Sequence, residues 1–152
     1  MEEIVLVAED ESRGPPRMQS VGPGIRVGRE RARYDIFFTD RRIIAAVIFS
    51  TAELSKWDVA AAFQAMHKWL KLKNERRAQF KGKMPEEILH LHPESFELPY
   101  DRIQSVKVKK KLVGAKLEVE IEGEEKIDLP IPKSKLREIE LVLRQYLPGK
   151  VK

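Results

Sequence analysis

The sequence predicts an α+β domain in which helices pack on a mostly antiparallel sheet. Two apolar runs flank four polar residues at 39–42, a pattern typical of a β-hairpin. Apolar and acidic residues alternate over 117–122, as expected for a half-buried antiparallel strand. Apolar residues also recur at helical spacing in two separate segments, after the hairpin and near the C-terminus. The order strands, helices, strands, helix defines the predicted class.

Composition limits the possible classes of protein. The chain has 152 residues, of which 42% are hydrophobic and 35% charged, which suits one domain with a core. The absence of cysteine excludes disulfides and cysteine-based zinc sites. The longest apolar run, 43–49, is too short to span a bilayer, and the acidic start does not resemble a signal peptide. We expect a cytoplasmic protein, with any membrane contact peripheral.

The first half of the chain contains three predicted strands and one breaker-rich loop. Residues 4–8 form the first strand, and glycine and proline residues over 14–24 indicate a loop. The runs 34–38 and 43–49 form the hairpin. The second run has no apolar–polar alternation, so we expect that strand to be covered on both faces.

The segment 51–92 is predicted to be helical. Thr51 and Ser55 are alternative N-caps, and Val59, Phe63, Met66 and Leu70 recur at helical spacing on one face. The helix becomes strongly basic and is predicted to end before Gly82, after which Pro85 begins a short second helix.

The last third is predicted to be a strand meander closed by a helix. Strands are expected at 103–110, 117–121 and 127–131, with turns near the intervening glycines. Ser134 is the predicted cap of the closing helix. The apolar face of this helix comprises Leu136, Ile139, Leu143 and Tyr146 or Leu147.

Two sequence stretches and the element order resemble the pleckstrin-homology-like (PH-like) superfamily, in its bacterial and archaeal PH and GRAM-related branch. The stretches are YDIFFTDRRII at 34–44 and FELPYDRIQSV at 96–106, and the order is strand, strand, amphipathic helix at the C-terminus. The resemblance implies a partly open antiparallel β-barrel of about seven strands with a C-terminal capping helix. On this basis residues 1–152 form a single PH-like domain, with 51–92 as a helical insertion within it.

The resemblance implies a binding or scaffold module, because such domains bind lipid headgroups, peptides or other proteins. Clustered positive charge with aromatic residues after the hairpin suggests where an anionic partner would bind. The candidate residues are Lys68, Trp69, Lys71, Lys73, Arg76, Arg77, Lys81 and Lys83. The competing interpretation is a solvated polar face with Trp69 packed on the barrel.

Three hypotheses follow for the partner. The leading one is an anionic lipid surface or a partner protein. The second is a nucleic acid bound by the basic helix at 68–83, and the third is assembly of a homo-oligomer through the insertion. A second basic strip, Lys107 and Lys109–Lys111, is either a further site or protection of a sheet edge.

Other candidate sites are weaker. His90 and His92 lie two residues apart but lack a clear third ligand, so we predict no metal site and no cofactor. Arg41 and Arg42 are expected to pair with nearby acids in a turn organised by Asp40. The sequence contains no cysteine nucleophile, glycine-rich phosphate loop or serine elbow motif, which favours a non-enzymatic protein.

Overall fold

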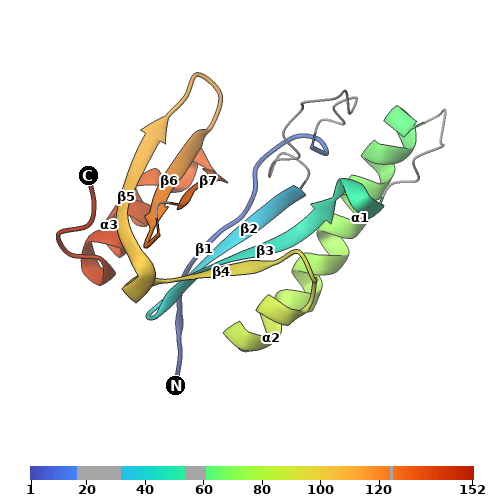
Figure 1. Cartoon of the computed structure of the whole chain (residues 1–152). Coiled ribbons are helices and arrows are strands. Elements are labelled where there is room, and N and C mark those ends of the chain that lie inside the picture. The colour runs from blue at the N-terminus through green and yellow to red at the C-terminus, as the bar shows by residue number, and fades with distance from the viewer. Residues whose placement is uncertain (17–31, 54–60, 124) are drawn as a thin grey trace.

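The fold is described from a computed structural model that covers residues 1–16, 32–53, 61–123 and 125–152 (Figure 1). Two predicted features, the alternative helix cap at Ser55 and the glycine–proline run at 22–24, lie outside the described residues. Val59 also lies outside the described residues, and the side chain of Phe63 is not described.

The described residues contain two antiparallel sheets, one of four strands and one of three. The first sheet has the order β1 (Ile4–Ala8), β2 (Ala32–Thr39), β3 (Arg42–Ser50) and β4 (Phe96–Pro99). The second has the order β5 (Ile103–Lys110), β6 (Ala115–Ile121) and β7 (Glu125–Ile131). In the part of the chain that is described, the sheets do not join into a closed barrel, which agrees with the predicted open form.

Helices connect and close these sheets. The helical segment, consisting of α1 (Ala61–Phe80) and α2 (Pro85–His90), lies between β3 and β4, and α3 (Leu136–Tyr146) follows β7. Figure 1 shows α1 running along the first sheet while α3 lies beside the second. The predicted α+β class is therefore confirmed. Among the described helices, none is both long and apolar enough to cross a membrane.

Strand β3 contributes side chains to two separate cores. Ile43, Ala45 and Val47 belong to the inner core, which lies between the sheets and α3. The alternating residues Ile44 and Ile48 belong to the outer core, on the opposite face. Every residue from Ile43 to Phe49 is buried, so the expectation that this strand is covered on both faces is confirmed.

The outer core forms where the helical segment packs on the first sheet. Trp69 and Phe80 from α1 lie in this core with Phe37 and Phe49 from the sheet. Both aromatic contacts are edge-to-face, with ring centroids 5.9 Å apart for Phe49 and Trp69 and 5.3 Å apart for Phe37 and Phe80. Such pairs add to the free energy gained by burying the rings.

Two local predictions are wrong. Met66 and Leu70 were expected on the buried face of α1, but they are 40% and 46% exposed. The larger ring of Trp69 faces the sheet instead, and consecutive residues of a helix point about 100° apart, which leaves Leu70 outside. Ser134 does not cap α3, because Lys135 occupies the N-cap position and the Ser134 hydroxyl donates to the Glu11 carboxylate.

The second sheet is covered on one face only. Buried and partly exposed residues alternate throughout β6, and Leu117 and Val119 face the inner core. Glu118 and Glu120 point to the opposite face, as the alternation predicts. The apolar face of α3, which includes Ile139 and Leu143, packs into the same inner core, as expected.

Candidate binding surface

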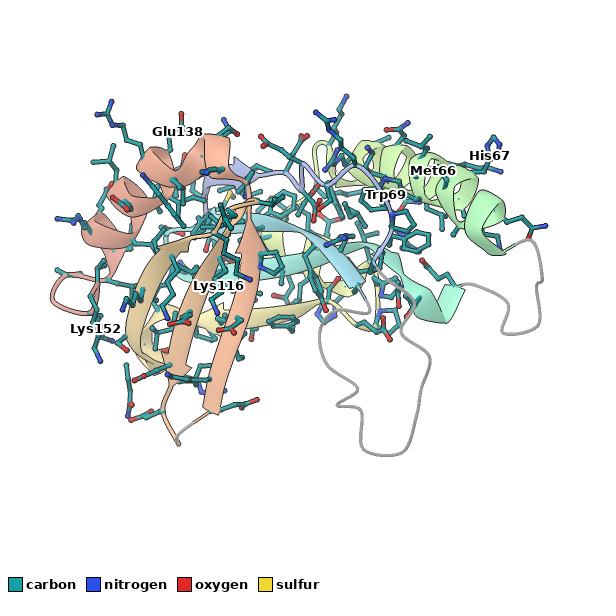
Figure 2. The ribbon with its side chains drawn as sticks, turned by 90° about the horizontal axis from the view of Figure 1, so that it is seen from above. Met66, His67, Trp69, Lys116, Glu138 and Lys152 are labelled. Carbon is teal, nitrogen blue, oxygen red and sulfur yellow. The ribbon has the colours of Figure 1, made fainter. Side chains whose placement is uncertain are left out.

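The eight basic and aromatic residues predicted as a binding surface do not all face the same way. Trp69 is fully buried, and the ammonium group of Lys73 lies 5.1 Å from the centre of its ring, a cation–π contact. Figure 2 shows Trp69 pointing from α1 toward the sheet, whereas His67 points away from it. Trp69 therefore packs against the first sheet, and Lys73 lies over its ring.

Arg77 is bound to a buried carboxylate of the first sheet. Its guanidinium donates to both carboxylate oxygens of Asp35, at 2.8 and 2.9 Å, and to the carbonyl of Asp10 at 2.8 Å. The Asp35 side chain is 1% exposed, and burial raises the pKa of its carboxyl even though Arg77 and the Asp10 amide favour the charged form. This pair joins α1, β2 and the segment after β1.

Arg76 is held in a second ion pair, with a carboxylate that follows β3. It donates two hydrogen bonds to Glu53, one of them at 3.0 Å, and Glu53 also accepts from the Ser50 amide. Burial alone would raise the pKa of Glu53, but the hydrogen bonds from Arg76 and Ser50 hold it below its usual range. Arg76 and Arg77 thus attach α1 to the first sheet and its flanking segments.

The remaining four residues of the predicted set face solvent. We call them the lysine surface: Lys68, Lys71, Lys81 and Lys83, all exposed. Lys68 donates a long hydrogen bond of 3.4 Å to the Glu53 carbonyl. Within the part of the chain that the structure describes, no carboxylate lies within ion-pair distance of these four ammonium groups. Their positive charge is therefore not neutralised by a carboxylate of the described residues.

The second basic strip, on the outer face of β5 and beyond, is partly neutralised. Lys109 and Lys116 both lie close to the Glu118 carboxylate, at 3.0 and 3.2 Å, and these contacts lower the pKa of Glu118. Lys110 and Lys111 are exposed and have no such partner among the described residues.

His90 and His92 each contact a carboxylate. His90 contacts Glu86 at 2.8 Å and His92 lies 3.4 Å from Glu53, so the two rings face different acids. No group of three or more possible ligand side chains suited to a metal ion occurs among the described residues.

The turn itself differs from the prediction. Its backbone amides at Arg41 and Arg42 donate to the Thr39 hydroxyl, not to Asp40. Arg42 pairs with three carboxylates, as expected of an arginine beside acids, whereas Arg41 is exposed. The three acids are Glu2, Glu86 and Glu97.

A crevice opens where the edge of β4 meets the second sheet. Its volume is about 300 Å³, at the small end for ligand pockets. Phe96, Leu98, Ile103 and Ile127 are among its apolar lining residues. Glu97, Arg102 and Glu125 also line the crevice, whereas the basic residues of the predicted set lie elsewhere.

Sequence reasoning missed the carboxylates that hold α1. A signal for Asp35 was present, because a single acid within the apolar run 34–38 is expensive to bury unless it is paired. No comparable signal identifies Glu53, which lies just after β3 in a short polar stretch.

Comparison with known proteins agrees with this architecture. A family model described as bacterial PH domain matches residues 87–145, which span most of α2, strands β4–β7 and nearly all of α3. No curated protein and no solved structure matches the chain significantly. The resemblance to the PH-like superfamily is therefore confirmed, and domains of this kind are generally non-catalytic modules that bind lipids or proteins.

Proposed function

We propose that this chain is a non-enzymatic binding module that meets an anionic lipid surface, and that the lysine surface makes the contact. The observation that carries the proposal is the set of four exposed ammonium groups without acidic partners among the described residues. Lysines near an anionic bilayer each contribute about 1 kcal/mol at physiological salt. A formal net charge of +5 favours the same encounter.

Magnitudes limit how strong this contact is. Four lysines at about 1 kcal/mol each give a dissociation constant of roughly 1 mM. Such a contact is weak, reversible and sensitive to salt, because exposed charges are screened beyond about 10 Å at 0.1 M ionic strength. Stable attachment therefore needs a second contact or a high local concentration.

The aromatic residues favour lipid over nucleic acid. Proteins that bind single-stranded nucleic acids stack bases on exposed aromatic rings. Both aromatic residues of the basic helix, Trp69 and Phe80, are buried in the outer core, with 0% and 7% exposure. The lysine surface consequently offers charge without a stacking platform.

The test is co-sedimentation with vesicles of phosphatidylcholine, with and without phosphatidylserine. The variant carries Lys68→Gln, Lys71→Gln, Lys81→Gln and Lys83→Gln. The matched control removes the same charge from lysines elsewhere, three exposed and one half-buried, through Lys126→Gln, Lys133→Gln, Lys152→Gln and Lys135→Gln. We expect the wild type to bind phosphatidylserine vesicles, and the first variant to lose much more binding than the control.

Three outcomes would contradict the proposal. The first is a folded wild type that binds no vesicle. The second is an equal loss of binding by the two variants, which would indicate an effect of net charge without a specific surface. Binding to an oligonucleotide that falls steeply with salt, without any preference for phosphatidylserine, would favour the nucleic-acid hypothesis instead.

A further inference from the structure

The tip of the β5–β6 hairpin exposes two large apolar side chains. Leu112 is 101% exposed and Val113 is 90% exposed, whereas the next most exposed aliphatic side chain, Leu141, reaches 63% among the described residues. The Lys111 amide donates to the Gly114 carbonyl at 3.1 Å and closes the tip. Figure 1 shows this turn projecting beyond the rest of the second sheet.

The local conformation fixes both side chains in solvent. Gly114 has a φ of +77°, a left-handed conformation that residues with a side chain rarely adopt. The register of β5 and β6 is continuous up to this turn, from Val108–Leu117 to Lys110–Ala115. The tip is thus a defined protrusion that none of the described residues covers.

Positive charge surrounds the exposed pair. Lys110 and Lys111 precede it directly and have no carboxylate within ion-pair distance among the described residues. Lys109 on β5 and Lys116 on β6 lie farther from the tip, and both contact the Glu118 carboxylate. In an anionic membrane the charged phosphates lie outside the boundary of the acyl chains. The apolar residues at the end of the tip would meet the acyl boundary, and the lysines that flank them would meet the phosphates.

The size of the tip favours a bilayer over a protein partner. A specific protein interface buries about 800 Å² on each partner, which two side chains on a narrow turn cannot supply. A fluid bilayer surrounds a protrusion on all sides and requires no matching pocket. Aliphatic side chains also gain more from hydrocarbon than from the stacked bases of a nucleic acid.

We infer that the tip enters the interfacial region of an anionic bilayer, with Leu112 and Val113 at the acyl boundary and Lys110 and Lys111 at the level of the phosphates. The inference rests on the proposed function, because both need an anionic lipid surface. It assigns the contact to a different element, the tip of the β5–β6 hairpin.

The expected effects follow from burial and charge. Replacing both apolar residues, Leu112→Ser with Val113→Ser, lowers partitioning onto phosphatidylserine vesicles about 10- to 100-fold, since the side chains are buried only to interfacial depth. Lys110→Gln and Lys111→Gln each lower it roughly fivefold. Leu141→Ser, an equally simple loss of an exposed leucine on α3, leaves partitioning unchanged.

The experiment uses the absence of cysteine, which makes a single introduced thiol the only labelling site. Val113→Cys carries an environment-sensitive fluorophore, and Lys133→Cys, an exposed position before α3, carries the same dye as a control. With phosphatidylserine vesicles we expect a blue shift and protection from an aqueous quencher at 113 only. Phosphatidylcholine vesicles should leave both labels in water.

The outcomes separate the two proposals. If the wild type binds phosphatidylserine vesicles while the label at 113 stays accessible to the quencher, and the serine variant binds as the wild type does, the tip inference is wrong and the proposed function stands. If the folded wild type binds no anionic vesicle, both are wrong.

Discussion

The two sheets differ in what covers them. The first sheet lies between the inner core and the helical segment, so β3 is buried from Ile43 to Phe49. The second sheet leaves one face in solvent, and β6 alternates between buried and partly exposed residues. The helical segment thus covers the outer face of one sheet and leaves that of the other open.

Ion pairs beneath α1 and ion pairs on the second sheet contribute differently to stability. Beneath α1, Asp35 and Glu53 pair with arginines whose side chains are only 21% and 17% exposed. On the second sheet, Glu118 is shared by two lysines in contact with water. Because solvent weakens exposed pairs and burial makes an unpaired charge costly, the first kind fixes the position of α1 and the second contributes little to stability.

The largest expected effect concerns the outer core. Trp69→Ala should lower the free energy of unfolding by about 3 to 5 kcal/mol, because it empties the space between α1 and Phe49. Trp69→Phe should cost much less, since the indole N–H has no hydrogen-bond partner among the described residues. Urea unfolding measures both. An unchanged midpoint for Trp69→Ala would mean that α1 does not stabilise the sheet.

Breaking the buried ion pair should have the next largest effect. Asp35→Ala leaves the Arg77 guanidinium without its carboxylate and should cost about 3 kcal/mol, near the lower end for buried pairs because Arg77 retains some exposure. Replacing both partners, by Asp35→Leu with Arg77→Leu, should recover part of the loss. Denaturant unfolding of the single and double variants gives the coupling. Lys126→Gln, at an exposed pair, should leave the midpoint unchanged.

The pH dependence of stability should further distinguish the ion pair of Glu53, beneath α1, from the ion pairs of Glu118, on the second sheet. The pKa of Glu53 lies below its usual 4.5, so its charged form stabilises the fold above that pH, and this stabilisation is lost as the pH falls through the lowered pKa. Glu53→Gln should cost about 1 kcal/mol near neutral pH, after allowance for partial exposure. The difference from the wild type should vanish in acid.

The matched substitution on the second sheet is Glu118→Gln. The pKa of Glu118 is lowered in the same direction by Lys109 and Lys116. Its loss should be smaller and should weaken with added salt, because its partner Lys109 is 43% exposed, whereas Arg76, the partner of Glu53, is 17% exposed. Unfolding in denaturant at two pH values and two salt concentrations tests both variants. Equal effects of the two substitutions would contradict the contrast between the sheets.

Much of the fold could be predicted because local patterns determine it. The burial of both faces of β3 followed from its unbroken apolar run, and the alternation over 117–122 gave the faces of β6. The orientation of α1 could not be predicted, since Met66, Trp69 and Leu70 are all apolar. Which of them is buried depends on the position of Phe49 across the outer core.

The candidate site could be predicted only in part. The sequence identifies lysines and arginines in one segment, but their direction depends on carboxylates distant in the chain. Asp35 is 42 residues from Arg77, and no helical period relates them. The turn near Val113 and Gly114 was predicted, but the exposure of Leu112 and Val113 at its tip was not, because apolar residues are usually buried.

The most direct test of the account compares two pairs of substitutions that remove the same charge. The inward pair is Arg76→Gln with Arg77→Gln, and the outward pair is Lys81→Gln with Lys83→Gln. Urea unfolding and binding to phosphatidylserine vesicles are measured on both. We predict that the inward pair loses stability and keeps binding while folded, whereas the outward pair keeps stability and loses binding roughly 25-fold. The reverse pattern, or equal losses of binding, would contradict the division of the basic segment 68–83 into an inward and an outward set of charges.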